Sequence, residues 1–193
     1  MTPREGYVGG VGETVPLEST LAVVQDHTRH FSDFTFVYPV ISRRSKGLSI
    51  GINVNPDKVC NFDCIYCEVD RRVPGAVSGV DLSQMRDELR AMIGFAQNGG
   101  LAKEPKFDEV PELTRNIRDI AFSGDGEPTM IHNFFEVVAT VAEVKRDANL
   151  DDTKIVLITD AAGLDKTTVR RGLEVMDANN GEVWGKLDAG TEE

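Results

Sequence analysis

Hydrophobic positions along the chain follow two periods, and together they predict an alternation of strands and helices. Apolar residues recur every three to four positions in four segments, which predicts helices at 17–31, 81–96, 134–144 and 165–176. Alternating or continuously apolar runs predict strands at 34–40, 48–54, 120–123, 155–159 and 183–187. Asp81 and Asp165 are suited to cap the helices that they begin. Residues 98–119 predict a polar connection.

The order of these elements predicts the fold class. From residue 48 onward strands and helices alternate, which is the pattern of parallel βαβ units joined by right-handed crossovers, so we expect an α/β fold. Functional loops of such sheets lie at the carboxyl ends of the strands. The predicted ends are followed by residues 60–67, 124–128, 159–160 and 186–188. We therefore expect the chemically distinctive segments of the chain to meet at one edge of the sheet.

The three cysteines of the chain all fall within eight residues, as Cys60-x3-Cys64-x2-Cys67. An odd number of closely spaced cysteines favours one shared metal or cluster over disulfide bonds. Sulfur ligands favour iron-sulfur clusters or zinc, and closed sites of both kinds usually need four protein ligands. With three thiolates, one iron of a [4Fe-4S] cluster would have no protein ligand and could bind a substrate or cofactor.

Zinc is the alternative metal, and it would need a histidine as a further ligand. The candidates are His27, His30 and His132. His27 and His30 have ligand-like spacing, but they lie on the predicted first helix.

Composition and charge limit the classes of function. A chain of 193 residues with 40% hydrophobic and 27% charged residues is typical of a folded domain with its own core. The net charge is -11, since residues 1–72 carry 8 basic and 9 acidic groups and residues 73–193 carry 13 and 23. This balance disfavours a large nucleic-acid footprint, and no DNA partner is expected. The basic clusters at 43–46 and 71–72 could still hold an anionic ligand. Without a secretory signal or an apolar run of about 20 residues, we expect a cytoplasmic protein without a membrane partner.

The cysteine motif, with Tyr66 just before its last cysteine, resembles the radical S-adenosylmethionine (radical SAM) superfamily. The segments 38–39, 42–44, 51–56, 60–67, 122–129 and 182–191 are similar to the group related to wyosine-type tRNA-modifying enzymes. This resemblance runs from about Phe34 to the last residue.

The resemblance implies a partial (β/α)6 TIM-type barrel that holds a [4Fe-4S] cluster and S-adenosylmethionine. It implies reductive cleavage of that cofactor to a 5′-deoxyadenosyl radical, with an electron donor such as flavodoxin or ferredoxin. The substrate is unknown, and tRNA is one candidate. The implied cluster ligands are Cys60, Cys64 and Cys67.

Residues of the four strand ends are the implied contacts of S-adenosylmethionine. Tyr66 would lie near the adenine. Residues Gly124, Asp125, Gly126 and Glu127 match a Gly-Gly-Glu-Pro segment that holds the methionyl amino group, although Asp125 stands where the first glycine would. Thr159, Lys186 and Asp188 would contact the ribose or the methionyl carboxylate.

Two further expectations concern domain organisation and the pocket. Residues 1–47 form an N-terminal extension with a helix and a strand, and residues 48–193 form a radical SAM core that stops after its fourth core strand. Asn53, Asn55, Arg43 and Arg44 are candidate pocket residues by position, and no catalytic residue is identified.

The alternatives to this function are a radical-generating activase of a protein partner and a non-catalytic iron-sulfur or zinc-binding protein.

Overall fold

The computed structural model describes residues 29, 31–75 and 77–186, which form a five-stranded sheet flanked by helices. The strand order is β1-β2-β3-β4-β5. Strand β1 pairs with β2 in antiparallel fashion, and the other three pairings are parallel. The strands are β1 Val37–Ser42, β2 Gly47–Ile52, β3 Ile117–Phe122, β4 Lys154–Thr159 and β5 Gly181–Gly185, and the longer helices are α2 Leu82–Gln97, α3 Phe134–Asp147 and α4 Thr167–Asp177. The predicted α/β fold with four parallel core strands is confirmed. The predicted helix at 17–31 lies outside the described residues except for residues 29 and 31.

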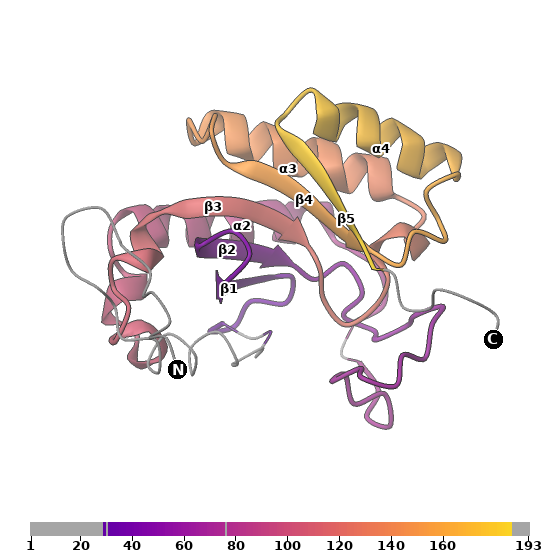
Figure 1. The fold of residues 1–193 in the computed structure, drawn as a ribbon, viewed down its shortest axis with the longest axis horizontal. Coiled ribbons are helices and arrows are strands. Elements are labelled where there is room, and N and C mark those ends of the chain that lie inside the picture. Colours follow the sequence, from indigo (N-terminus) through magenta and orange to yellow (C-terminus); the bar gives the residue numbers. More distant parts are fainter. Residues whose placement is uncertain (1–28, 30, 76, 187–193) are drawn as a thin grey trace, which may run out of the picture.

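The sequential order of the strands places the helices on one face of the sheet. Each right-handed crossover moves one strand further in the same direction, so successive helices fall on the same side. Figure 1 shows α3 and α4 side by side along strands β4 and β5. In the described part of the chain, none of the three helices α2, α3 and α4 covers the opposite face of the sheet.

Alternation along the strands separates these two faces chemically. Leu48, Ile50 and Ile52 of β2 are fully buried in the hydrophobic core, and β3 and β4 contribute Ile120, Phe122, Ile155 and Leu157 to it. Each such side chain stabilises the fold by about 1.5–3 kcal/mol when fully buried. The intervening positions of β2 and β3 are small or polar, namely Ser49, Gly51, Asp119 and Ala121.

The face of the sheet opposite α2, α3 and α4 is concave. Strands β1 and β5 are the two edges of the sheet, and four strand spacings of a flat sheet amount to about 19 Å. Yet Arg44, two residues beyond β1, places its guanidinium carbon 4.7 Å from the ring centroid of Trp184 on β5. The two long side chains cover part of this span, and the curvature of the sheet covers the rest, since Val40 of β1 and Trp184 of β5 also line one cavity on this face.

The structure differs from the predicted connection at 98–119. It contains short 3-10 turns at Leu101–Lys103, Pro105–Phe107 and Leu113–Arg115, and it buries Leu101 and Phe107 in the core. These apolar residues are spaced for tight turns rather than for a long helix or a strand, so the pattern did not reveal them.

Some predicted boundaries are wrong by two or three residues. Strand β3 begins at Ile117 rather than residue 120. The prediction excluded Asp119 because it is polar, but Asp119 is part of the strand and accepts a hydrogen bond from the Ser49 hydroxyl on β2. Helix α4 begins at Thr167, and its cap Lys166 makes no side-chain capping bond, so the predicted cap Asp165 is wrong. Strand β5 begins at Gly181 rather than residue 183.

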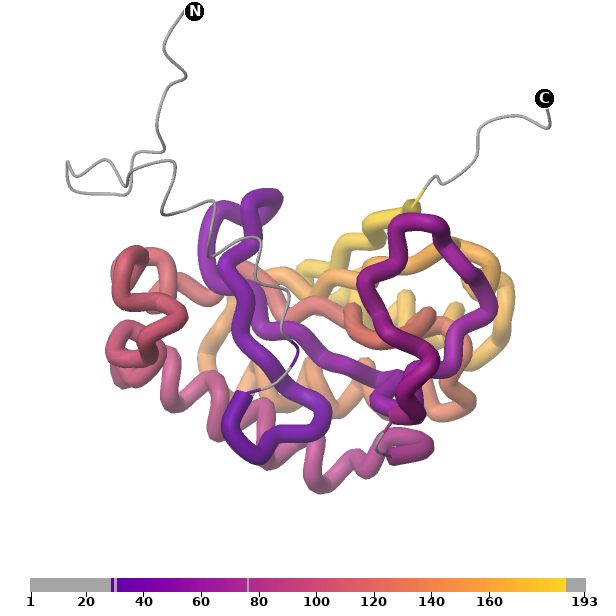
Figure 2. The backbone as a smooth tube through the Cα atoms, turned by 90° about the horizontal axis from the view of Figure 1, so that it is seen from below, coloured from indigo at the N-terminus to yellow at the C-terminus, as the bar shows by residue number. Residues whose placement is uncertain are grey.

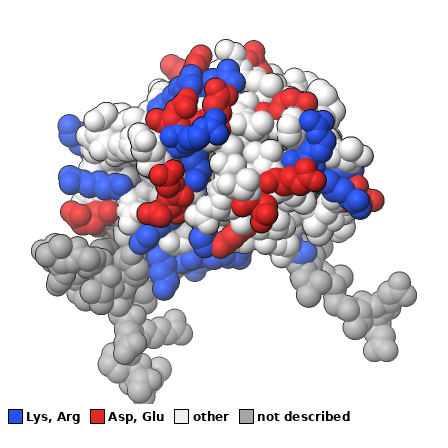
Figure 3. Space-filling view, turned by 90° about the horizontal axis from the view of Figure 1, so that it is seen from above, with Lys and Arg blue, Asp and Glu red and all other residues white. Residues whose placement is uncertain are grey.

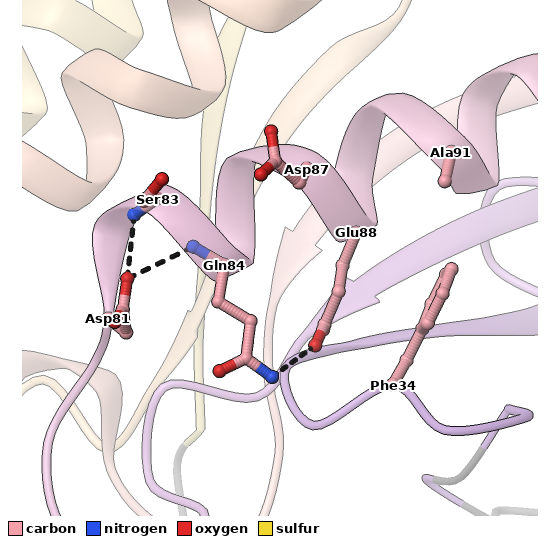
Figure 4. Close-up of a pocket in the computed structure, with 7 residues that line it drawn as sticks. All are labelled: Phe34, Asp81, Ser83, Gln84, Asp87, Glu88 and Ala91. Atoms are coloured by element: carbon pink, nitrogen blue, oxygen red, sulfur yellow. Dashed lines mark hydrogen bonds between the residues drawn. The ribbon is translucent and has the colours of Figure 1, made fainter.

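Helix α2 begins at its predicted cap and fastens the start of β1. Figure 4 shows the Asp81 carboxylate accepting from the backbone amides of Ser83 and Gln84, at 2.9 and 3.0 Å. Further along the helix, Glu88 is buried and accepts the backbone amides of residues 35–37. In the hollow of about 560 Å³ beside these residues, Asp81, Gln84 and Glu88 are therefore already engaged in hydrogen bonds within the fold. None of the helices in the described part of the chain has both the length and the apolar character needed to cross a membrane.

Candidate functional site

A cavity of about 810 Å³ lies on the concave face at the carboxyl ends of the parallel strands. Its walls come from the loops after β2, β3 and β4 and from the end of β5, as the positions of the motifs predicted. Figures 1 and 2 show the loop after β2 standing beside the carboxyl end of β5. The residues that carry the predicted chemistry and line it are Cys60, Cys64, Tyr66, Cys67, Gly124, Gly126, Glu127 and Lys186.

The three cysteines form no disulfide bond among the described residues, and all three line this one cavity. Cys60 and Cys64 are half-buried and Cys67 is exposed. A turn closed by the amide of Cys67 and the carbonyl of Cys64, 2.9 Å apart, keeps the last two cysteines close together. Within the described residues, no three cysteine, histidine, aspartate or glutamate side chains already converge as a metal site. The donor chemistry fits a sulfur-ligated cluster, which stays a prediction.

Histidine does not complete this donor set in the described part of the chain. His132 is exposed and does not line the cavity. His27 and His30 lie outside the described residues.

Arg71 joins the cysteine loop to the loop after β3. Its guanidinium donates to the backbone carbonyl oxygens of Lys58 and Asp125, the latter at 2.9 Å. Its other terminal nitrogen lies 3.5 Å from the sulfur of Cys67. One side chain thus contacts both ends of the cysteine segment and the neighbouring loop, which fixes their relative position. The basic cluster at 71–72 was visible in the sequence, but this role was not.

Asp125 is held by side chains from two other segments. Arg29 donates to one carboxylate oxygen at 2.7 Å, and the Asn53 amide donates to the other at 2.8 Å. The Asn53 side-chain oxygen in turn accepts the backbone amide of Asp125 at 3.1 Å. Both oxygens of this carboxylate are therefore engaged in holding the loop, which accounts for an aspartate where the related motif has glycine.

The glycines of this loop are required by close backbone packing. A Cβ at Gly126 would lie 2.1 Å from the carbonyl oxygen of Val59, and one at Gly124 would lie 2.3 Å from the side-chain oxygen of Asn53. Neither neighbour can move without displacing the cysteine loop or the Asn53–Asp125 bonds. Asn53 and Asn55 are buried supports of the loops rather than lining residues.

Glu127 connects the loop after β3 to the end of β4. One carboxylate oxygen accepts from the Thr129 amide and hydroxyl, at 3.1 and 2.7 Å, and from the Thr159 hydroxyl at 2.5 Å. The other accepts the Asp160 amide at 2.9 Å. Only 5% of the residue is exposed. The structure thus gives Glu127 a bracing role, and its predicted contact with an ammonium group stays a prediction.

Asp160 presents a free acceptor at the cavity. One of its carboxylate oxygens accepts the Ala162 amide at 2.9 Å, and the other is buried and has no hydrogen-bond partner among the described residues. Because a buried acceptor costs free energy unless a donor reaches it, this oxygen suits a ligand with an amino or hydroxyl group. Thr159 is buried beneath it, and Lys186 is exposed at the rim. Asp188 lies outside the described residues.

Two buried titratable groups lie further along the concave face. Burial raises the pKa of the Asp119 carboxyl above its ordinary value of 3.8, although the hydroxyls of Ser45 and Ser49 partly offset this. Burial also raises the pKa of Tyr38, whose hydroxyl lies 2.9 Å from that of Ser123. At both positions, burial therefore favours the neutral form of the side chain.

Comparisons with known proteins give distant partial relatives. No family model matches the chain, and no solved structure gives a significant match. A protein named GTPase Obg from Brachyspira hyodysenteriae is 28% identical over 152 residues, which is 79% of this chain and 18% of that protein. The UPF0026 protein MJ1312 of Methanocaldococcus jannaschii is 30% identical over 138 residues, 70% of this chain and 36% of that protein. A UPF0026 protein of Helicobacter pylori is 28% identical over 104 residues, 53% of this chain and 29% of that protein. The chain thus spans from about a fifth to just over a third of these relatives.

Proposed function

We propose that the chain is the cluster-binding part of a radical SAM enzyme. The observation that supports this most directly is the shared cavity, which three cysteines and the loop after β3 line together at the carboxyl edge of the sheet. The sequential strand order, the one-sided helices and the concave free face also support a partial (β/α)6 barrel. Reductive cleavage of S-adenosylmethionine is the chemistry that a bound [4Fe-4S] cluster would supply.

The residues of the chain have separate tasks in this proposal. Cys60, Cys64 and Cys67 would supply thiolates, which leaves one iron position open to the cofactor. Gly124 and Gly126 let the backbone approach closely, and Asp160 offers its free oxygen to an amino or hydroxyl group. Substrate identity, including tRNA, stays open in this proposal.

The name of one relative suggests a second activity, GTP hydrolysis, which the sequence does not favour. A P-loop needs Gly-x4-Gly-Lys followed by serine or threonine, because its backbone amides and lysine hold the phosphates. In this chain the only Gly-Lys pair, at 185–186, is followed by Leu187.

Anaerobic reconstitution with iron and sulfide tests the proposal. We expect about four irons per chain and 5′-deoxyadenosine formation with a strong reductant. Cys64→Ala should lose stable cluster loading, whereas the control Asp63→Ala, an exposed neighbour in the same loop, should retain it. A cluster that forms but never cleaves S-adenosylmethionine would leave a non-catalytic scaffold, and zinc with no iron would contradict the proposal. Product formed only on a protein substrate would indicate an activase.

A further inference from the structure

The cavity extends well beyond its cysteine end. Its lining continues along the concave face to the turn between β1 and β2, where Ser42, Arg43 and Arg44 face Ser49 and Trp184. The whole cavity, at about 810 Å³, has the size of a pocket that encloses a small-molecule ligand. The proposed function assigns no task to the residues at this second end.

Two arginines at this end, Arg43 and Arg44, have no acidic partner in the part of the chain that the structure describes. No hydrogen bond or ion pair joins Arg43 or Arg44 to a carboxylate among the described residues, although the chain as a whole carries a net charge of -11. Over much of the face in Figure 3, by contrast, basic and acidic side chains lie interspersed. Adjacent unpaired guanidiniums on a cavity wall are suited to an oxyanion, which they can bind through paired hydrogen bonds.

Trp184 holds one of these arginines in place. The Arg44 guanidinium lies over the indole ring, 4.7 Å from its centroid. The indole nitrogen donates to the Glu182 carboxylate at 3.0 Å, and Glu182 is also paired with Lys154. A stacked guanidinium keeps its edge available to a ligand and loses less conformational entropy when one binds.

We infer that this end of the cavity is a subsite for the phosphate or carboxylate group of a small-molecule substrate, bound by Arg43 and Arg44. The inference rests on the proposed function, because it places the anionic group in the same cavity as the cysteine loop. Phosphate and carboxylate share the required chemistry, and the experiment separates them.

The test uses the fluorescence of Trp184, the single tryptophan of the chain, in protein without iron. The protein is titrated with inorganic phosphate and, separately, with succinate, with sodium chloride holding the ionic strength constant. We expect a saturable change with at least one of these anions. The Arg43→Gln/Arg44→Gln double variant should weaken binding about tenfold or more, since charge-assisted hydrogen bonds are lost.

Two further variants make the result decisive. Arg43→Gln alone leaves the Arg44–Trp184 contact intact and should still weaken binding. Arg115→Gln/Arg170→Gln removes two exposed arginines elsewhere and should bind like the unmodified protein. A change that does not saturate, or that is equal in all variants, overturns the subsite. Because no iron is present, failure here is distinguishable from failure of reconstitution.

Discussion

Glu127 offers a quantitative test of how the candidate site is held together. Truncation in Glu127→Ala removes the acceptor of two backbone amides, the buried one of Thr129 and the partly buried one of Asp160, and of two hydroxyls. Each buried donor left without a partner costs about 1–3 kcal/mol. The hydroxyls can rotate toward other acceptors, so the two amides set the estimate, at about 2–6 kcal/mol. Because the Asp160 amide is only partly buried, we expect a loss in the lower half of that range, about 3 kcal/mol.

Urea unfolding of the protein without iron measures this loss. With a slope of about 2 kcal/mol per M, a loss of about 3 kcal/mol lowers the unfolding midpoint by about 1.5 M. Glu127→Gln keeps one carbonyl oxygen as acceptor and should lose about half as much. The control Glu109→Ala removes an exposed carboxylate and should stay within about 0.5 kcal/mol of the unmodified protein. Equal midpoints for Glu127→Ala and Glu109→Ala would refute the bracing role.

Other parts of the site give three further predictions. Arg71→Gln should speed amide hydrogen exchange across residues 58–73. The Arg72 side chain is 91% exposed, so the control Arg72→Gln should leave this exchange unchanged. Equal exchange in the two variants would contradict the role of Arg71 in joining the two loops. Gly126→Ala should lower the stability of the protein in urea, because the added Cβ would meet the backbone of Val59. Gly94→Ala within α2 adds a Cβ that meets no other atom, so it should raise the stability by about 1 kcal/mol. The reverse order of the two variants would refute the packing argument. Folding raises the pKa of the Asp119 carboxyl, so the neutral carboxyl stabilises the folded state relative to the ionised one. This contribution to stability is fully present below pH 3.8 and is lost as the pH rises through the pKa of the folded state. Asp119→Asn should therefore gain stability relative to the unmodified protein as pH rises, and a constant gap in urea unfolding would count against this.

The core strands and longer helices could be predicted from the sequence because their apolar periods are strong. Strand β4 is a continuous apolar run, and α2 combines an apolar face with a capping aspartate. The start of β3 was missed because Asp119 is polar, and only its contact with Ser49 from another strand explains its burial. Short turns such as Pro105–Phe107 have too few residues to show a period.

The site was predictable in its location but not in its internal contacts. Strand ends and motif spacing were enough to bring the cysteine loop and the loop after β3 to one cavity. The bonds of Arg71, Arg29 and Asn53 join residues up to 96 positions apart, so no local pattern signals them. Asp160 could be noted from its position after β4, but its free oxygen is a property of the packed structure.

The separation of the two sheet faces affects how this protein can change over evolution. Side chains that hold the fold together alternate along the central strands with side chains that line the cavity, such as Ile50 beside Ser49 and Ile120 beside Ala121. A substitution at a cavity-facing position can therefore alter ligand chemistry without disturbing the helix-packed layer. Only a one-residue slip in strand pairing would exchange the two sets, and that would expose the whole apolar row. New specificity can thus arise at single positions while the scaffold stays the same.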